Sequence, residues 1–328
     1  MPAVDEPYHV YREQLTSKYH GLALWNPNPV EGLYDCGNVS IGDVGYLCDG
    51  DFIRMFNVTL PWDHSSNRKL GRPEEYDPLE LEKDDDDDFV NVRGSENFQA
   101  EYHTRYVTKV ENAGNVQAET PDETKGQTYK CRARCRGALL SLPHGGRRKD
   151  IIRTKVFGNY IRDNADSWFE WSKKWGLPVE RMEDLILVTG CTLVTPWAAA
   201  AFDDYTAPVD ATTTISLYAQ KFDHGRAHFL WSNIHGNVEY HNSHSDANGE
   251  QPLPQNQCVF LRGFRAKRTL FWTKHRAAAE PPPDDPDNRR EDEMQVTRAP
   301  DVSNYRDPLI GILDYIVEVR LPEYDRSP

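Results

Sequence analysis

Short apolar runs separated by glycines and prolines dominate the chain between Gly21 and Pro61. Two of these runs, residues 44–47 and 52–58, are separated by Asp49-Gly50, which is typical of a tight hairpin turn because glycine adopts positive φ without strain. Apolar runs of this length between turn residues are typical of strands. The pattern therefore predicts a β-meander over residues 21–61.

A long helix is predicted between Arg148 and Trp175, because large apolar side chains recur there at spacings of three and four residues. The members of this stripe are Ile152, Val156, Tyr160, Trp168, Trp171 and Trp175. Gly158-Asn159 is a point at which the helix could divide, and Gly176 followed by Pro178 is typical of a helix end. Aromatic residues at helical spacing belong most often to a core, so we interpret the tryptophans as packing residues.

Several shorter elements follow from the same reasoning. The continuous apolar run 184–191 predicts a central strand, and three further strands are predicted over 213–219, 228–234 and 257–263. A short helix is predicted over 8–20 and another over 305–319. These elements predict an α+β fold, with a β-rich main domain that contains an antiparallel sheet and a central helix, followed by a C-terminal helix.

Charge divides the chain into segments. A length of 328 residues, a net charge of −14 and a mean hydropathy of −0.74 are typical of a globular chain with polar insertions. Residues 74–88 are strongly acidic and predict a solvated loop, and residues 280–293 combine acids with prolines as disordered linkers do. We assign the main domain to residues 1–279, the acidic linker to 280–301, and the C-terminal helix and tail to 302–328.

The cellular location and the presence of an enzyme or cofactor are predicted chiefly from targeting and catalytic motifs that the sequence lacks. Residues 1–19 contain no long apolar run, so we predict neither a signal peptide nor a membrane anchor. A cytosolic or nuclear location follows, and we assign the chain to the cytoplasm. The sequence contains no phosphate loop, dinucleotide fingerprint or serine elbow, so we expect no cofactor. This weighs against an enzyme, although an enzyme of an unrecognised type stays open.

Against the acidic background, residues 129–136 alternate strictly between cations and smaller or apolar residues. As one strand, the segment would present four cations on a single face, namely Lys130, Arg132, Arg134 and Arg136. Other cations gather nearby or in a second island, namely Arg147, Arg148, Lys149, Arg262, Arg265, Lys267 and Arg268. We predict that these residues bind an anionic surface. The alternative is a solvated sheet face whose charge is neutralised by the acidic segments of the same chain.

The segment 235–246 is rich in histidine and includes three weak metal candidates, His235, His241 and His244. Zinc accepts imidazole and carboxylate ligands, but these spacings fit no known ligand signature. We therefore interpret the segment as a polar turn between strands and predict no metal site.

Five sequence segments, taken together, resemble a large group of uncharacterised proteins from mushroom-forming fungi: Gly21-Leu-Ala-Leu-Trp-Asn-Pro-Asn-Pro29, Ser40-Ile-Gly-Asp-Val-Gly-Tyr46, Phe52-Ile-Arg-Met-Phe-Asn-Val58, Asp184-Leu-Ile-Leu-Val-Thr-Gly-Cys191 and Cys258-Val-Phe-Leu-Arg-Gly-Phe264. The resemblance extends from about Tyr8 to Ile316 and implies no established activity. The order of strand, basic strand, helix and a Leu-Val-Thr-Gly strand is more remotely similar to fungal gasdermin-like proteins. That similarity implies a pore former in which Lys130, Arg132, Arg134 and Arg136 contact acidic lipid and the helix from Tyr305 acts as a restraint.

Three classes of function remain at this point. The first is a non-enzymatic intracellular protein that binds an anionic surface, with acidic membrane lipid as its partner, in defence or self-recognition. The second is a protein-interaction module that binds a protein partner through the tryptophan-bearing helix, and the third is an enzyme of unrecognised type. The net negative charge weighs against a nucleic-acid partner, because it opposes approach to a polyanion.

Overall fold

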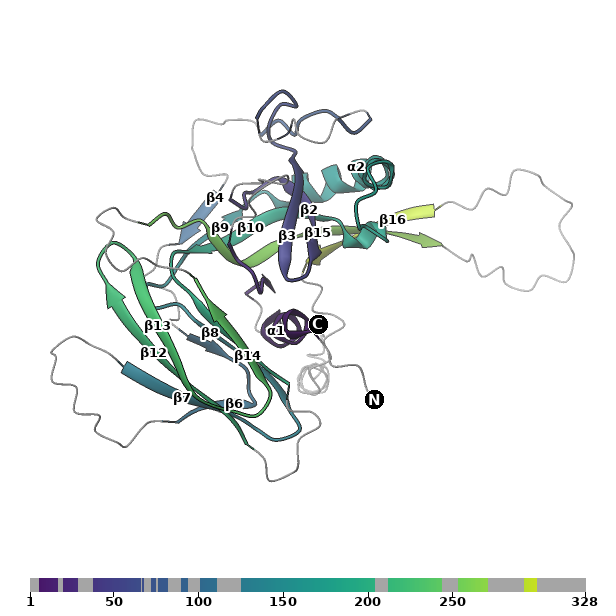
Figure 1. Cartoon of the computed structure of the whole chain (residues 1–328). Coiled ribbons are helices and arrows are strands. Elements are labelled where there is room, and N and C mark those ends of the chain that lie inside the picture. The colour runs from purple at the N-terminus through teal and green to yellow at the C-terminus, as the bar shows by residue number, and fades with distance from the viewer. Residues whose placement is uncertain are drawn as a thin grey trace, which may run out of the picture.

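The chain forms two β-rich parts, as seen in the computed structural model (Figure 1). One part is an eight-stranded sheet covered by helix α2, and the other consists of two four-stranded sheets with helix α1 beside them. The structure describes residues 6–16, 20–28, 38–65, 67, 72–74, 76–81, 90–93, 101–110, 125–203, 212–243, 253–270 and 292–299.

The eight-stranded sheet is built on two long antiparallel strands, β10 (Ile186–Val194) and β15 (Gln257–Leu270). Every residue of β10 is buried, as its continuous apolar run predicted. Shorter strands pair with the outer edges of these two: β2 (Asp43–Cys48) and β9 (Arg147–Ile151) with β10, and β1 (Leu22–Ala23) and β16 (Asp292–Ala299) with β15. The sheet continues through β3 (Asp51–Asn57), which pairs with β2, and β4 (Val90–Arg93), which pairs with β9.

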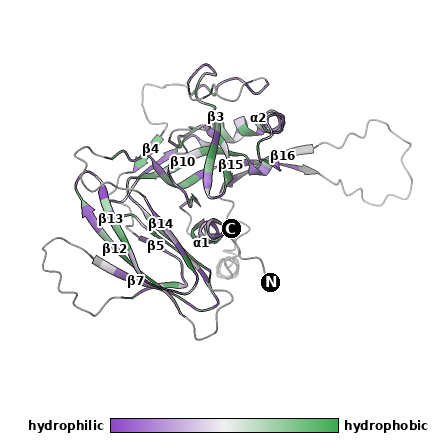
Figure 2. Ribbon diagram, in the orientation of Figure 1, coloured by the Kyte–Doolittle hydropathy of each residue, from purple (hydrophilic) through white to green (hydrophobic). Residues whose placement is uncertain are grey.

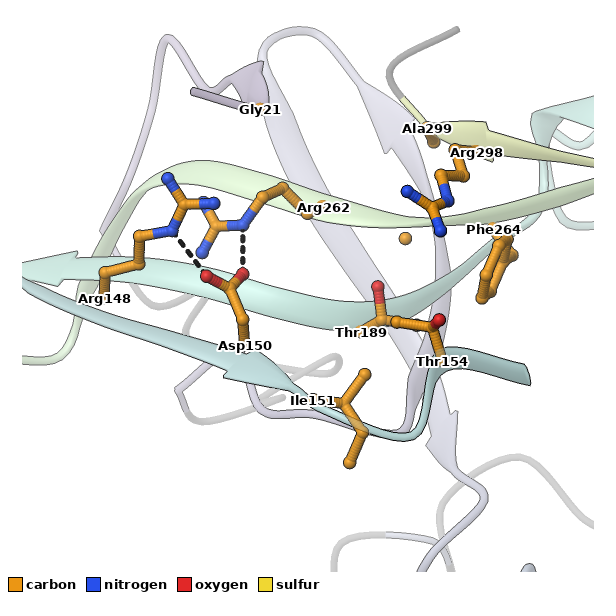
Figure 3. Close-up of a pocket in the computed structure, with 11 residues that line it drawn as sticks. Gly21, Arg148, Asp150, Ile151, Thr154, Thr189, Arg262, Phe264, Arg298 and Ala299 are labelled. Atoms are coloured by element: carbon orange, nitrogen blue, oxygen red, sulfur yellow. Dashed lines mark hydrogen bonds and ion pairs between the residues drawn. The ribbon is translucent and has the colours of Figure 1, made fainter. Parts of the chain in front are cut away.

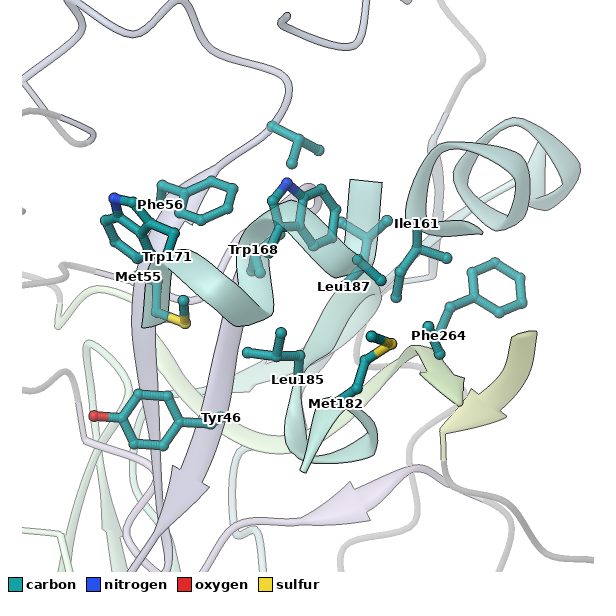
Figure 4. Close-up of a cluster of buried hydrophobic side chains, with 14 of the residues drawn as sticks. Tyr46, Met55, Phe56, Ile161, Trp168, Trp171, Met182, Leu185, Leu187 and Phe264 are labelled. Carbon is teal, nitrogen blue, oxygen red and sulfur yellow. The ribbon is translucent and has the colours of Figure 1, made fainter. Parts of the chain in front are cut away.

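Helix α2 (Thr154–Lys174) packs its aromatic residues on one face of this sheet (Figure 4). The ring of Phe56 lies 5.6 Å from those of both Trp168 and Trp171, each at nearly a right angle, which is a favourable aromatic geometry. The short 3-10 helix η3 (Met182–Asp184) completes the cluster and leads into β10. Trp168 and Trp171 are therefore core residues, as predicted. Trp175 follows the helix and its exposed fraction is 49%, so the prediction that it is a packing residue was wrong.

The prediction that Ile152 and Val156 belong to the packed face of this helix was wrong, whereas Tyr160 does pack against the core. The exposed fractions of Ile152 and Val156 are 55% and 38%, and the buried face begins at Phe157 instead. The helix starts only at Thr154, so Ile152 precedes it. It does not divide at Gly158, and it ends where Gly176 adopts a φ of +64°.

The second part consists of two facing sheets whose strands are joined in pairs. The first sheet has the order β14 (Val238–Asn242), β11 (Ala198–Asp203), β8 (Arg136–Ser141), β5 (Glu101–His103). The second has the order β13 (Arg226–His235), β12 (Thr213–Phe222), β7 (Lys125–Cys131), β6 (Val107–Val110). The chain passes from sheet to sheet by β5–β6, β7–β8, β11–β12 and β13–β14, so these connections share one end. We call the two turns at residues 104–106 and 132–135, together with Lys130 near the end of β7, the tip.

Helix α1 (Pro7–Thr16) makes the first of these sheets buried on both faces. Tyr11 and Leu15 of α1 pack against one face through Ala199 and Ala201, whereas Ala198 and Ala200 face the opposite sheet. Figure 2 shows hydrophobic (green) stretches among hydrophilic (purple) ones on the strands of both parts. The predicted α+β fold, β-rich with antiparallel sheets and a central helix, is confirmed, as are the 49–50 hairpin and the strands over 213–219, 228–234 and 257–263.

The strand predicted over 129–136 was wrong. Strand β7 ends at Cys131 and β8 begins at Arg136, with a turn between them in which Arg134 adopts a φ of 58°. The amide of Cys135 donates to the carbonyl of Arg132 at 3.2 Å, which closes the turn. The alternating pattern therefore continues across a reversal of the chain, and the four predicted cations do not share one strand face.

Two acidic segments also differ from prediction. Residues 292–299 of the predicted linker 280–301 form β16, in which Met294 and Val296 pack against the α2 core. The predicted solvated loop over 74–88 contributes Tyr76 to that core, and the Tyr76 hydroxyl donates to the carbonyl of Asn57 at 2.8 Å. Apolar residues spaced among the acids explain both outcomes. The predicted helix 305–319 lies outside the described residues.

Candidate functional site

The tip gathers exposed cations from neighbouring turns. The amide of Arg132 donates to the carbonyl of Tyr106 at 3.0 Å, which holds the two turns side by side. Lys130, Arg132 and Arg134 are exposed, and Arg105 lies over the ring of Tyr106 at 4.5 Å. The tip is thus an exposed positive feature built from two turns.

Arg136 has a different environment from the other predicted tip cations. Its Nε lies 3.2 Å from Oδ1 of Asp203, which follows the cross-strand register between β8 and β11. In the part of the chain that the structure describes, no carboxylate pairs with Lys130, Arg132 or Arg134. The structure therefore separates one neutralised arginine from three exposed cations.

The three predicted cations of β9 are divided between opposite faces of the sheet, because side chains alternate along a strand. Arg147 and Lys149 line a cavity of about 330 Å³ together with Cys191 and Val92. Burial raises the pKa of the Cys191 thiol to about 11, so this cysteine is not a reactive thiolate at neutral pH. Arg148 points to the other face, toward Asp150 and Arg262.

Arg262 bonds to four groups of the protein. Its Nε pairs with Asp150, its Nη1 donates to the carbonyl of His20 at 2.8 Å and to Oγ1 of Thr192 at 3.1 Å, and its Nη2 donates to the carbonyl of Lys149 at 3.2 Å. Burial lowers its pKa, and the Asp150 carboxylate opposes that change. Arg262 therefore joins β9, β10 and its own strand β15, and it also lines a cavity.

A glycine makes this ion pair possible. Asp150 on β9 and Arg262 on β15 are both paired in register with Gly190 on β10. A Cβ atom at Gly190 would lie 2.2 Å from Oδ1 of Asp150 and 3.0 Å from Nε of Arg262. The missing side chain lets the guanidinium cross β10 to reach the carboxylate.

A cavity of about 370 Å³ opens beside this ion pair, on the sheet face where α2 begins (Figure 3). Arg298 of β16 is paired in register with Phe264, so it lies diagonally across from Arg262 on the same face. Figure 3 shows its guanidinium pointing into the cavity, near Thr189 and Thr154, opposite the Asp150 pair. We call this the arginine cavity; it is lined by Gly21, Arg148, Asp150, Ile151, Thr154, Thr189, Arg262, Gly263, Phe264, Arg298 and Ala299.

The remaining predicted cations of β15 do not enter the arginine cavity. Lys267 and Arg268 are exposed farther along the strand, and Arg268 pairs with Asp166 of α2 at 2.5 Å. Arg265 is half-buried. Arg298 was not predicted as a site residue, because the acidic and proline-rich segment before it favoured a linker. The alternation of Met294 and Val296 with polar residues was the signal that could have identified its strand.

The histidine candidates lie in different environments. The His241 ring stacks on Trp25 at 4.0 Å and meets Trp197 edge-on at 4.8 Å, and burial lowers its pKa to about 4. His235 is exposed at the end of β13, and His244 lies outside the described residues. Among the described residues, no group of three or more potential metal ligands comes together.

Comparisons with known proteins add no relative: no family model, curated protein or solved structure matches the chain. Among the described residues, no helix combines the length and apolar character needed to cross a membrane.

Proposed function

We propose that this chain is a non-enzymatic intracellular protein that binds an anionic surface through the tip, with acidic membrane lipid as the partner. The observation that carries the proposal is the exposure of Lys130 near the end of β7 and of Arg132 and Arg134 on the turn that follows, with no carboxylate paired to them among the described residues. Acidic lipid also agrees with the remote similarity to fungal gasdermin-like proteins, in which basic residues meet such lipids.

The expected binding is electrostatic and peripheral. Each lysine or arginine near an acidic membrane contributes about 1 kcal/mol, so three cations give on the order of 100-fold in partitioning. Among the described residues of the two turns, none is a large exposed apolar side chain that could enter the bilayer. The interaction should therefore weaken strongly with salt, because the screening length falls from about 10 Å at 0.1 M to about 3 Å at 1 M.

The test is co-sedimentation of the full chain with vesicles that do or do not contain phosphatidylserine. We expect the wild-type chain to bind only the acidic vesicles, and the triple variant K130Q/R132Q/R134Q to lose most of that binding. The full chain is needed because a chain ending at Ala279 would lack β16 and Arg298.

The matched control is R162Q/K174Q/K221Q, which removes three exposed cations from other elements and changes the net charge equally. This variant should bind as the wild type does. Equal loss of binding in both variants would show that only net charge matters, and no binding at low salt would refute the proposal.

A second candidate, a protein-interaction module, is favoured by one observation on β13 and β14. The exposed fractions of Leu230, Ile234 and Tyr240 are 57%, 38% and 39%, and these two strands are sheet edges within the described residues. Exposed apolar residues on an edge are typical of contact surfaces. Under this alternative, the tip substitutions would leave capture of the partner protein unchanged.

A further inference from the structure

We propose that the arginine cavity is a second anion site, separate from the tip, that binds the phosphate group of a small phosphorylated ligand. It lies in the eight-stranded sheet, whereas the tip lies at the end of the facing sheets. The proposal does not depend on membrane binding, because it rests on different residues.

The charge of the cavity favours a dianion. Arg148, Arg262 and Arg298 supply three positive charges and Asp150 supplies one negative charge, which leaves two positive charges around the cavity. A phosphate monoester carries a charge of about −1.5 to −2 at neutral pH, whereas a simple carboxylate carries only one. The charges therefore balance best with a phosphate group.

The hydrogen-bond donors that face the cavity are not all used by the protein. Arg262 is largely committed to Asp150 and to strand groups. By contrast, Arg148 bonds Asp150 through Nε, and within the described residues neither its terminal nitrogens nor any nitrogen of Arg298 contacts a protein acceptor. Guanidinium groups bind phosphate through two parallel N–H donors, so these two side chains suit that role.

Asp150 orients the arginines of the cavity, although its own negative charge would repel an anionic ligand. It pairs with Arg148 and Arg262 at once, so the two guanidinium groups are held beside each other rather than repelled (Figure 3). The side chain of Arg262 is only 13% exposed, and that of Arg148 is 30% exposed. A fixed pair of arginines loses little conformational freedom when it binds an anion.

The size and shape of the cavity limit the ligand. A volume of about 370 Å³ lies near the lower end of small-molecule sites, enough for a phosphate and a small organic group. The hydroxyl-bearing side chains of Thr154 and Thr189 line it beside the arginines, and Phe264 and Ile151 supply apolar walls. The same chemistry could come from a soluble phosphate ester or from the head group of phosphatidic acid.

The experiment titrates the full chain by calorimetry with inorganic phosphate, with glycerol 3-phosphate and with vesicles containing phosphatidic acid, against chloride and acetate at matched ionic strength. We expect saturable binding of one phosphate group per chain, weakened about tenfold or more in R298Q. R148Q is the second variant and should weaken binding similarly. Binding of glycerol 3-phosphate would identify a soluble ester, and binding of phosphatidic acid vesicles alone, if lost in R298Q, would identify a head group.

Two controls separate this site from other effects. K267Q changes an exposed cation of β15 outside the cavity and should bind phosphate within about twofold of the wild type. K130Q/R132Q/R134Q should also bind phosphate normally, so failure of the membrane proposal leaves this one intact. Unchanged unfolding midpoints would show that R298Q and R148Q are folded. The proposal is overturned if both arginine variants bind phosphate as the wild type does, or if phosphate binds no better than chloride in every arm.

Discussion

The tip and the arginine cavity contain the same kind of side chain in opposite surroundings. At the tip, Arg132 and Arg134 extend from a turn and are exposed. In the cavity, Arg262 is nearly buried and shares Asp150 with Arg148. Exposed cations change the field around the protein and contribute little to its stability, whereas a buried cation contributes to the fold as well as to binding.

His241 extends the comparison to a buried base without a carboxylate. Arg262 keeps its charge beside Asp150, but His241 lies between two indole rings, and burial lowers its pKa to about 4. The neutral form is therefore favoured at neutral pH. Burial thus leads to pairing where an acid is present and to loss of the proton where none is.

The largest expected effect is on stability when Arg262 is replaced. R262Q should lower the free energy of unfolding by about 3–5 kcal/mol, because it leaves Asp150 without its most buried partner and removes bonds to β9, to β10 and to the carbonyl of His20. R132Q at the tip should change it by less than about 0.5 kcal/mol. Urea unfolding of both variants measures the difference. Equal stability of the two would contradict the contrast between the regions.

A smaller loss is expected from G190A. The added methyl group would meet Asp150 and Arg262, so we expect a destabilisation of about 1–3 kcal/mol together with weaker phosphate binding. G158A is the matched control, because its Cβ would meet only the ring of Phe264 at an ordinary 3.7 Å within a helix. That control should be neutral or slightly stabilising. Thermal unfolding measures both, and an unaffected G190A would show that the pair does not need this glycine.

The smallest effect at neutral pH is expected from H241F, which keeps an aromatic ring between Trp25 and Trp197. The pKa of His241 is lowered in the folded state, so its contribution to stability is present above pH 6.5 and is lost as the pH falls toward 4. Unfolding free energies measured between pH 4 and 6.5 should rise with pH in the wild type and less steeply in H241F. The exposed His228 provides the control H228Q, which should keep the wild-type slope.

Elements with a local signal could be predicted from the sequence. The 49–50 turn, the β10 run and the burial of Trp168 and Trp171 on α2 each depend on spacing within one element, and each was confirmed. The alanine-rich β11 was missed, because Ala198–Asp203 has low intrinsic preference for strands. Its small residues are needed where α1 and the facing sheet approach both sides of the same strand.

The candidate sites were predictable only as a set of cations. The sequence identified Lys130, Arg132, Arg134, Arg148 and Arg262, but it placed Arg132 and Arg134 on a strand face with Lys130 rather than on the turn after β7. It gave no reason to associate Arg148 with Arg262, which are far apart along the chain. Arg298 was not predicted, because it lies in a segment whose composition favoured disorder.

By itself, the sequence determined the fold class, the main core helix and the concentration of positive charge in an acidic chain. Only the tertiary structure decided which cations are exposed at the tip and which line the cavity with Asp150. The physical reason is that hydrophobic periodicity and turn preference are local properties, whereas the pairing of a charge depends on strand register. Asp150, Gly190 and Arg262 become neighbours only when β9, β10 and β15 align in one sheet.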